Sequence, residues 1–475
     1  MISNYFSTYL KKKKPIVKRL VETLGKDFEY VSCLGTDVKG TAVYVDRAIT
    51  DVVNSHLTES GFVIKVKGVN VYFEYSVNEI NEKNFDSIVE TIKKEANIKR
   101  NIQAVKTINI EEETLVKDFV RKDTGKNYDT TEVVAILNDI VKKNLDDVVF
   151  NLTVGAEINE YSKMFISKKK ELTQYYTWSN MMAYALSRRE DSVKAAYSGD
   201  GYPTFEEGIN NLQNQVDYAK KVSCELLDSK PPVPGIYTII TDSSITGLIA
   251  HEAFGHGVEM DMFVKDRAKS VEYMNKQVAS PLITMHDGGS AALSAASYFF
   301  DDDGVLAQDT VIIEKGILKR GISDMLSASE LGTKPTGNGR RESYKRKAYT
   351  RMTNTFFEGG TTSLDDMIKS VDYGYMIFDT DNGMEDPKNW GIQCSALYGR
   401  EIKNGKFTGK IVSPVVMSGY VIDLLESIDA VATNFKVTGS GSCGKGYKEW
   451  VRVSDGGASL KARVKIGWLN KLLKF

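Results

Sequence analysis

His251-Glu252-Ala253-Phe254-Gly255-His256 is the segment that most constrains the fold and the chemistry of this chain. The chain has four histidines, and two of them stand here, five residues apart, with a carboxylate directly after the first. Two neutral imidazoles and an adjacent glutamate are the groups needed to bind a divalent metal and to act as general base on its water. The segment therefore predicts a metal-dependent hydrolytic site.

The five-residue spacing makes a specific demand on the backbone. In a regular α-helix, residues four apart share a face, whereas residues five apart point about 140° away from each other. Both histidines can bind one metal if the helix contains one extra residue, as in a π-bulge, and such bulges gather at functional sites. Gly255 and Gly257 flank the second histidine and are expected to ease the distortion. Two unrelated helical histidines are the alternative interpretation.

A catalytic zinc site needs three protein ligands and an open position. The candidates for the third ligand are Glu259, Asp261, His286 and Cys443. Cys443 lies in the glycine-rich stretch 439–446, where a structural thiol is unexpected, so its setting favours reactivity or ligation. The chemistry alone leaves the choice between Cys443 and an acidic residue open.

Other polar segments admit a functional and a structural interpretation. Four residues among glycines and hydroxyl residues are candidates for holding a peptide carboxylate or backbone, with loop structure as the alternative: Asn338, Arg340, Arg351 and Asn354. The acidic run 301–303 lacks the ligand spacing of a calcium-binding loop, which favours an acidic turn. The stretch 439–446 also lacks the spacing of a phosphate-binding loop.

Composition narrows the class of protein. The chain has 62 basic and 63 acidic residues, which argues against a dominant nucleic-acid surface. It has no run of about 18 apolar residues and no signal-like apolar segment, so no membrane span is expected. The four cysteines are scattered, without a close pair, which favours a reducing compartment and packing roles for Cys33, Cys224 and Cys394. We expect a cytoplasmic protein that binds neither nucleic acid nor membrane.

A length of 475 residues favours two domains, and the Pro-Pro-Val-Pro-Gly stretch at 231–235 is the best boundary. We predict an α+β protein: residues 1–230 as an α/β domain with a mixed sheet and long helices, and residues 231–475 as a β-rich domain carrying the metal helix. Helices are expected near 15–25, 83–97, 130–144 and 205–227. Strands are expected near 28–33, 41–46, 62–67, 70–75, 236–240, 281–285, 310–314, 376–379, 392–397 and 431–437.

The stretch 251–261, His-Glu-Ala-Phe-Gly-His-Gly-Val-Glu-Met-Asp, resembles the signature of the TldD/PmbA family of metalloproteases, in its TldD-type metal-bearing subunit. The resemblance continues in order through 301–304, 337–340, 351–355, 403–406 and 442–445. It implies that His251, His256 and Cys443 bind zinc and that Glu252 is the base. The chain departs from the family pattern at 348–350 and 451–458, where Arg452 and Ala458 stand in place of prolines and the proline often seen before the Arg351 segment is absent.

The resemblance implies a zinc-dependent peptidase that cleaves small or unfolded peptides by metal-activated water with a glutamate base. It also implies a homodimer, or a heterodimer with a homologous subunit that lacks the metal motif. Two alternatives are a hydrolase of non-peptide amides and a non-catalytic metal-binding partner subunit. The intact Glu252 argues against the second alternative, because a structural zinc site needs no base.

Overall fold

The computed structural model describes residues 1–475 except 69–70, 101–109, 440, 446–447 and 468–475. In the N-terminal half, the described strands form one curved sheet in the order β4-β3-β1-β6-β7-β5, with β2 beside β1 and β8 beside β7. β5 runs parallel to β7 and the other pairs are antiparallel, so the sheet is mixed. Its strands are β1 (Tyr30–Val45), β2 (Thr50–Asn54), β3 (Glu59–Gly68), β4 (Val71–Val77), β5 (Leu115–Arg121), β6 (Val149–Ser167), β7 (Lys170–Arg189) and β8 (Ser192–Tyr202).

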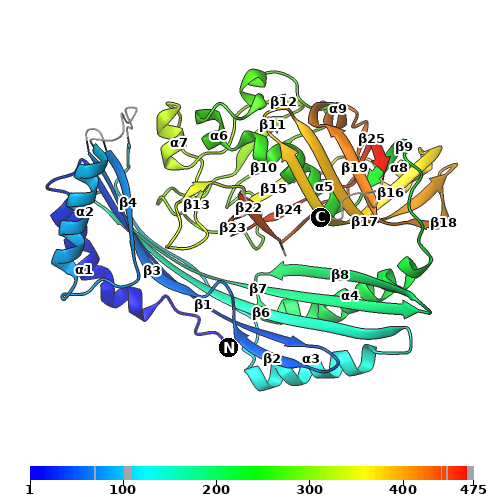
Figure 1. The fold of residues 1–475 in the computed structure, drawn as a ribbon, viewed down its shortest axis with the longest axis horizontal. Coiled ribbons are helices and arrows are strands. Elements are labelled where there is room, and N and C mark those ends of the chain that lie inside the picture. Colours follow the sequence, from blue (N-terminus) through cyan, green and yellow to red (C-terminus); the bar gives the residue numbers. More distant parts are fainter. Residues whose placement is uncertain (69–70, 101–109, 440, 446–447, 468–475) are drawn as a thin grey trace.

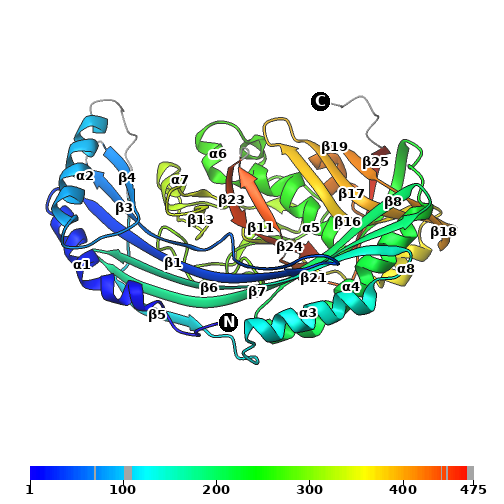
Figure 2. The same cartoon turned by 60° about the horizontal axis from the view of Figure 1, so that its bottom comes forward.

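Four long helices cover the outer face of this sheet (Figure 2). They are α1 (Thr8–Leu24), α2 (Phe85–Arg100), α3 (Thr130–Asn144) and α4 (Phe205–Glu225), the last continuing into the 3₁₀ turn η1 (Leu226–Asp228). Each helix has an apolar face at helical spacing; in α3 it consists of Val133, Leu137 and Val141. The helices and the sheet bury two apolar clusters between them, one beneath α1 and α2 and one beneath α3 and α4.

The C-terminal half lies against the inner face of the sheet (Figure 1). One of its sheets follows the path β16-β9-β25-β19-β17, and the pairing of β16 with β17 closes that path into a ring. A second sheet has the order β12-β11-β10-β15-β24-β21. The first sheet contains β9 (Gly235–Thr241), β16 (Tyr373–Asp386), β17 (Gly391–Lys403), β18 (Lys406–Val412), β19 (Val415–Tyr420), β20 (Ala430–Val431) and β25 (Leu460–Gly467), and the second contains β10 (Met285–Asp287), β11 (Thr310–Glu314), β12 (Ile317–Leu318), β15 (Asn354–Phe357), β21 (Lys436–Thr438) and β24 (Ser454–Gly457).

Short elements complete the C-terminal half. Two small strand pairs are β13 (Gly339–Arg340) with β14 (Tyr349–Thr350), and β22 (Ser442–Lys445) with β23 (Lys448–Arg452). The helical segments are α5 (Ser243–Leu248), the π-helical turn η2 (Ile249–Gly255), the 3₁₀ turns η3 (His256–Val258) and η4 (Lys269–Tyr273), α6 (Met260–Val264), α7 (Met325–Glu330), α8 (Leu364–Lys369) and α9 (Val421–Glu426). None of the described helices combines the length and the apolar character that a membrane crossing requires.

The predicted α+β class with a mixed N-terminal sheet is confirmed. The helix at 130–144 and the strand at 310–314 match their predicted bounds, while the strands expected at 28–33 and 41–46 are one long strand, β1. The three long strands between residues 149 and 202 were not predicted. Whether the two halves are separate domains divided at residue 230 stays a prediction.

Candidate metal centre

The two histidines lie on one continuous helical segment whose pitch changes between them. α5 begins at its N-cap Asp242, whose carboxylate accepts a hydrogen bond from the Ile245 amide. After Leu248 the backbone widens into the π-helical turn η2, and His256 opens the 3₁₀ turn η3. The predicted π-bulge is therefore confirmed, and it supplies the extra residue that the five-residue spacing requires.

Gly255 and Gly257 allow close packing around this turn. Neither glycine has a left-handed φ, and that of Gly255 is −61°, so other residues could adopt the same backbone. A Cβ atom at Gly255 would lie 2.2 Å from the sulfur of Met352, and one at Gly257 would lie 2.7 Å from a carboxylate oxygen of Glu385. Gly255 thus allows the close approach of Met352, whereas at Gly257 only the flexible end of Glu385 would have to shift; close packing is a different reason from the predicted easing of backbone distortion.

His251, His256 and Cys443 come together in space. One ligand atom from each lies within 4.8 Å of the others, and the Cys443 Sγ is 3.4 Å from the His256 Nε2. The two imidazole rings are perpendicular, with centroids 5.3 Å apart. His251 and Cys443 are 2% and 7% exposed, whereas His256 is partly open. The three candidate ligands come from two segments that are distant in the sequence, and the fold brings them together.

Cys443 lies on a strand of the β22–β23 hairpin, opposite Val451 in register. The stretch expected to be a glycine loop is therefore partly ordered as a hairpin, with Ser440 and Gly446 outside the described residues. Burial opposes ionisation of the Cys443 thiol, but the neighbouring His251 and His256 lower its pKa to about 4. The two histidines thus favour the thiolate, which is the form that binds metals.

The donor set fits a zinc ion. Among the described residues, neither ring nitrogen of His251 has a hydrogen-bond partner, although the side chain is buried. Such an orphaned group is costly unless something binds it. Two imidazoles and one thiol, with His256 partly open, are a donor set that fits an open, catalytic type of zinc site better than a closed four-ligand one.

The carboxylate of Glu252 lies over the ligand atoms. Its oxygens are 3.9 Å from the His251 Nε2 and 3.6 Å from the His256 Nε2. The side chain is about one-fifth exposed, so it borders both the ligands and the open side of the centre. This position suits a proton acceptor better than a fourth ligand that closes the site.

Glu259 and Lys445 support His256 on the side of its Nδ1 atom. The Glu259 carboxylate is 3.3 Å from the His256 Nδ1, and the Lys445 Nζ lies 3.0 Å from Glu259 and 2.8 Å from Asp261. Burial raises the pKa of Glu259, but Lys445 and His256 together hold it well below its usual range. A carboxylate on the second ring nitrogen fixes the orientation of a metal-binding imidazole. Glu259 and Asp261, the acidic candidates for the third ligand, thus lie on the Nδ1 side of His256, where Glu259 contacts the ring and Asp261 contacts Lys445.

Arg351 joins the histidine helix to the cysteine hairpin. Its guanidinium donates to the backbone carbonyls of Cys443, at 2.7 Å, and of Glu449, and its Nε is 3.7 Å from Glu259. The side chain is 1% exposed. These contacts fix the distance between the two segments that carry the candidate ligands.

The other residues predicted to contact substrate make hydrogen bonds within the protein. The Asn338 Nδ2 donates to Asp287 and to the Arg351 carbonyl, and the Asn354 Nδ2 donates to the Gly288 carbonyl. Asn338, Arg351 and Asn354 are buried, so in this chain they hold loops in place. Arg340 is partly exposed and lines a pocket, and contact with a substrate stays a prediction for all four residues.

His286 and the acidic run 301–303 lie outside the metal centre. Asp309 and Glu358 contact the two ring nitrogens of His286 at 2.7 and 2.9 Å, so it is a hydrogen-bonded histidine. The acidic run is a buried turn, in which Asp302 pairs with Lys163 and Asp303 with Lys65 of the N-terminal sheet. These ion pairs connect the two halves of the molecule.

Sequence reasoning missed Glu385, which lies on β16 and accepts a hydrogen bond of 3.0 Å from the Gly257 amide. Burial raises its pKa well above the usual range. Nothing local in the stretch Met384-Glu385-Asp386 indicates this contact, because the two partners are 128 residues apart.

Comparison with known proteins gives the family. Residues 234–458 match the family model of the PmbA/TldA metallopeptidase C-terminal domain. A zinc metalloprotease TldD homolog of Saccharolobus solfataricus is 30% identical over 65% of this chain and 69% of its own length. The chain belongs to the PmbA/TldD family. A metalloprotease of Methanocaldococcus jannaschii is 26% identical over 85% of this chain and 89% of its own, and a TldD homolog of Buchnera aphidicola is 34% identical over 54% of each.

Two solved structures share the fold. A Thermotoga maritima protein described as a modulator of DNA gyrase aligns with a TM-score of 0.77 at 18% identity, covering 96% of this chain and all of that one. TldE of Thermococcus kodakarensis aligns with a TM-score of 0.74 at 17% identity, covering 95% of this chain and all of its own. Membership in the PmbA/TldD family supports a metallopeptidase-type function.

Proposed function

We propose that this chain is a zinc-dependent peptidase of the HExxxH…C type, acting on small or unfolded peptides. The proposal rests on one observation above all: His251, His256 and Cys443 converge with a spare carboxylate, Glu252, beside them. A bound zinc ion would supply a Lewis acid that polarises a carbonyl and acidifies water. The name of the zinc metalloprotease TldD homolog supports zinc as the metal.

The chain's own residues then have separate tasks. Glu252 accepts a proton from the attacking water on one of its oxygens and passes that proton to the leaving amine. Glu259 keeps the Nδ1 proton of His256 in place, which leaves the Nε2 free as a ligand atom. Arg351 and Lys445 hold the two ligand-bearing segments at a fixed separation.

The protein is proposed to work in the cytoplasm as a dimer, either with itself or with a homologous subunit that lacks the metal motif. The structural similarity to TldE supports a partner of that kind. The four free thiols among the described residues agree with a reducing compartment.

The test of the catalytic assignment is Glu252→Gln. The variant should keep its zinc content and lose hydrolysis of an unstructured peptide by roughly two to four orders of magnitude, because a general base contributes about that much. Zinc content and turnover are measured on the same preparation. Wild-type turnover in a zinc-loaded variant would remove Glu252 from this role. If the wild-type protein cleaves small amides but not peptides, the amide-hydrolase alternative is favoured.

A further inference from the structure

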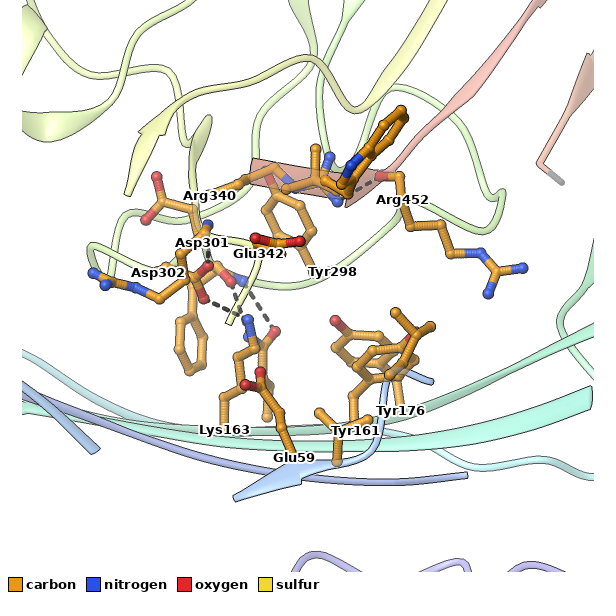
Figure 3. A pocket seen from close by; sticks show the side chains of 17 residues that line it. Glu59, Tyr161, Lys163, Tyr176, Tyr298, Asp301, Asp302, Arg340, Glu342 and Arg452 are labelled. Carbon is orange, nitrogen blue, oxygen red and sulfur yellow. Dashed lines mark hydrogen bonds and ion pairs between the residues drawn. The ribbon is translucent and has the colours of Figure 1, made fainter. Parts of the chain in front are cut away.

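A pocket of about 90 Å³ lies where the β22–β23 hairpin meets the inner face of the eight-stranded sheet (Figure 3). Both halves of the molecule line it: Tyr161 and Tyr176 come from the sheet, and Tyr298, Arg340 and Arg452 come from the C-terminal half. We call it the Arg452 pocket. None of these five residues has a role in the metal centre described above.

The Arg452 pocket is one strand away from the metal centre. Val451 lines the pocket, pairs in register with Cys443 and packs against it. Neighbouring residues on a strand point to opposite faces, so the Arg452 side chain and the Cys443 thiol lie on opposite sides of β23.

The pocket has positive charge that no carboxylate in the described part of the chain neutralises. The Arg340 guanidinium donates to the carbonyls of Met352 and Arg452, at 2.6 Å each, and takes part in no ion pair there. The Nε of Arg452 is buried and has no hydrogen-bond partner among the described residues. Figure 3 shows the Arg452 side chain extending away from Arg340 and past Tyr161 and Tyr176, with its guanidinium at the edge of the side chains drawn.

The acidic groups of the pocket are already engaged. Asp302 pairs with Lys163, and Glu342 lies 3.5 Å from Arg346. Asp301 accepts hydrogen bonds from three backbone amides, and burial together with Asp303 raises its pKa well above the usual range. Glu59 accepts a bond from the Tyr344 amide, and burial raises its pKa. The other cations of the pocket are paired as well, Lys163 with Asp302 and Arg341 with Glu74, so the guanidinium groups of Arg340 and Arg452 are the charges left for a ligand.

We propose that the Arg452 pocket binds a carboxylate of the peptide substrate, held by the Arg452 guanidinium. Guanidinium groups bind carboxylates through paired, charge-assisted hydrogen bonds, and the phenol hydroxyls of Tyr161 and Tyr176 can complete the set. Arg340 positions Arg452 by holding its carbonyl. The carboxylate is either the C-terminus of the peptide or an acidic side chain. This inference rests on the proposed peptidase function.

The experiment measures binding, not cleavage. Zinc-loaded full-length chain carrying Glu252→Gln is titrated against three labelled, unstructured peptides of one sequence: a free C-terminal acid without acidic side chains, its C-terminal amide, and that amide with one Gln replaced by Glu. The same titrations use Arg452→Met and, as a matched control, Arg189→Met, an exposed arginine paired with Asp228 at the end of β7.

We expect at least one carboxylate-bearing peptide to bind about tenfold more tightly than the plain amide, which is the size of one charge-assisted contact. Arg452→Met should abolish that preference and Arg189→Met should keep it. The free acid and the Glu peptide separate a C-terminal carboxylate from a side-chain one.

Equal affinity for all three peptides on the unsubstituted Arg452 background would overturn the proposal without any need for a variant. So would a preference that survives Arg452→Met, since the carboxylate would then bind elsewhere, for example to the zinc ion. No step of this experiment requires hydrolysis. A chain that prefers carboxylate-bearing peptides but does not cleave peptides would support this inference and contradict the proposed function.

Discussion

The N-terminal sheet and the metal centre are stabilised in different ways. Beneath α1–α4 the buried side chains are mainly apolar, and regular strand pairing satisfies the backbone. Around the metal centre, the buried groups include Glu259, Arg351 and His251, and the backbone is irregular. Apolar burial stabilises the first region without fixing any one contact, whereas the second depends on individual ion pairs. Losses in the first should therefore reduce stability alone, and losses in the second should reduce metal binding.

Leu137→Ala tests the first region and should have the largest effect on stability. Leu137 is fully buried on α3, so its truncation should lower the free energy of unfolding by about 2–5 kcal/mol. Urea unfolding measures the loss, and zinc per folded chain should stay unchanged. Val116→Ala, at a site 72% exposed on β5, is the control and should change stability by less than about 0.5 kcal/mol. Loss of zinc in Leu137→Ala would show that the two regions are not independent.

The same difference explains what the sequence could reveal. Val133, Leu137 and Val141 recur at helical spacing, so α3 was predictable, and the spacing of His251 and His256 predicted the π-helical turn. Both are local patterns. The long strands β6 and β7 were missed because the C-terminal half buries polar groups on their inner face, so the usual alternation is hidden.

Gln174 on β7 is such a group, and its amide donates to the Phe300 carbonyl. The contact of Lys445 with Glu259 joins residues 186 positions apart and has no local signal. Resemblance to the family, and not chemistry, favoured Cys443 over Glu259 as the third ligand. Local periodicity thus predicts the elements, while the fold alone decides which buried charges meet.

Lys445→Met tests the second region. Without Lys445, Glu259 and Asp261 lose the cation that neutralises them, and His256 loses a firm support. We expect zinc affinity to fall about 10–100-fold, as for other residues that support metal ligands. Competition with a chelating dye measures it. Lys410→Met, at an exposed lysine paired with Glu401, should leave the affinity unchanged. A normal zinc affinity in Lys445→Met would contradict the dependence on single ion pairs.

Asp379→Asn tests whether buried charge near the metal helix makes stability depend on pH. Burial raises the pKa of Asp379 to about 7, helped by Asp242, which caps α5. The folded chain therefore binds an extra proton between about pH 4 and 7, so the stability from this group is present at low pH and is lost as pH rises through 7.

The Asp379→Asn variant should gain stability relative to wild type between pH 5 and 8, by about 1–2 kcal/mol, less than the full shift implies because the side chain is partly exposed. Thermal unfolding at both pH values measures it, with the exposed Asp372→Asn as control. A constant difference between wild type and Asp379→Asn across that range would contradict the assignment.

The most direct test of the metal centre is X-ray absorption at the zinc edge of the loaded protein. We predict one sulfur neighbour at about 2.3 Å and nitrogen neighbours at about 2.0–2.1 Å. Cys443→Ala should remove the sulfur signal and most of the zinc, while Cys394→Ala, at another buried free cysteine, should retain both. A wild-type spectrum with only nitrogen and oxygen neighbours would contradict the centre described here.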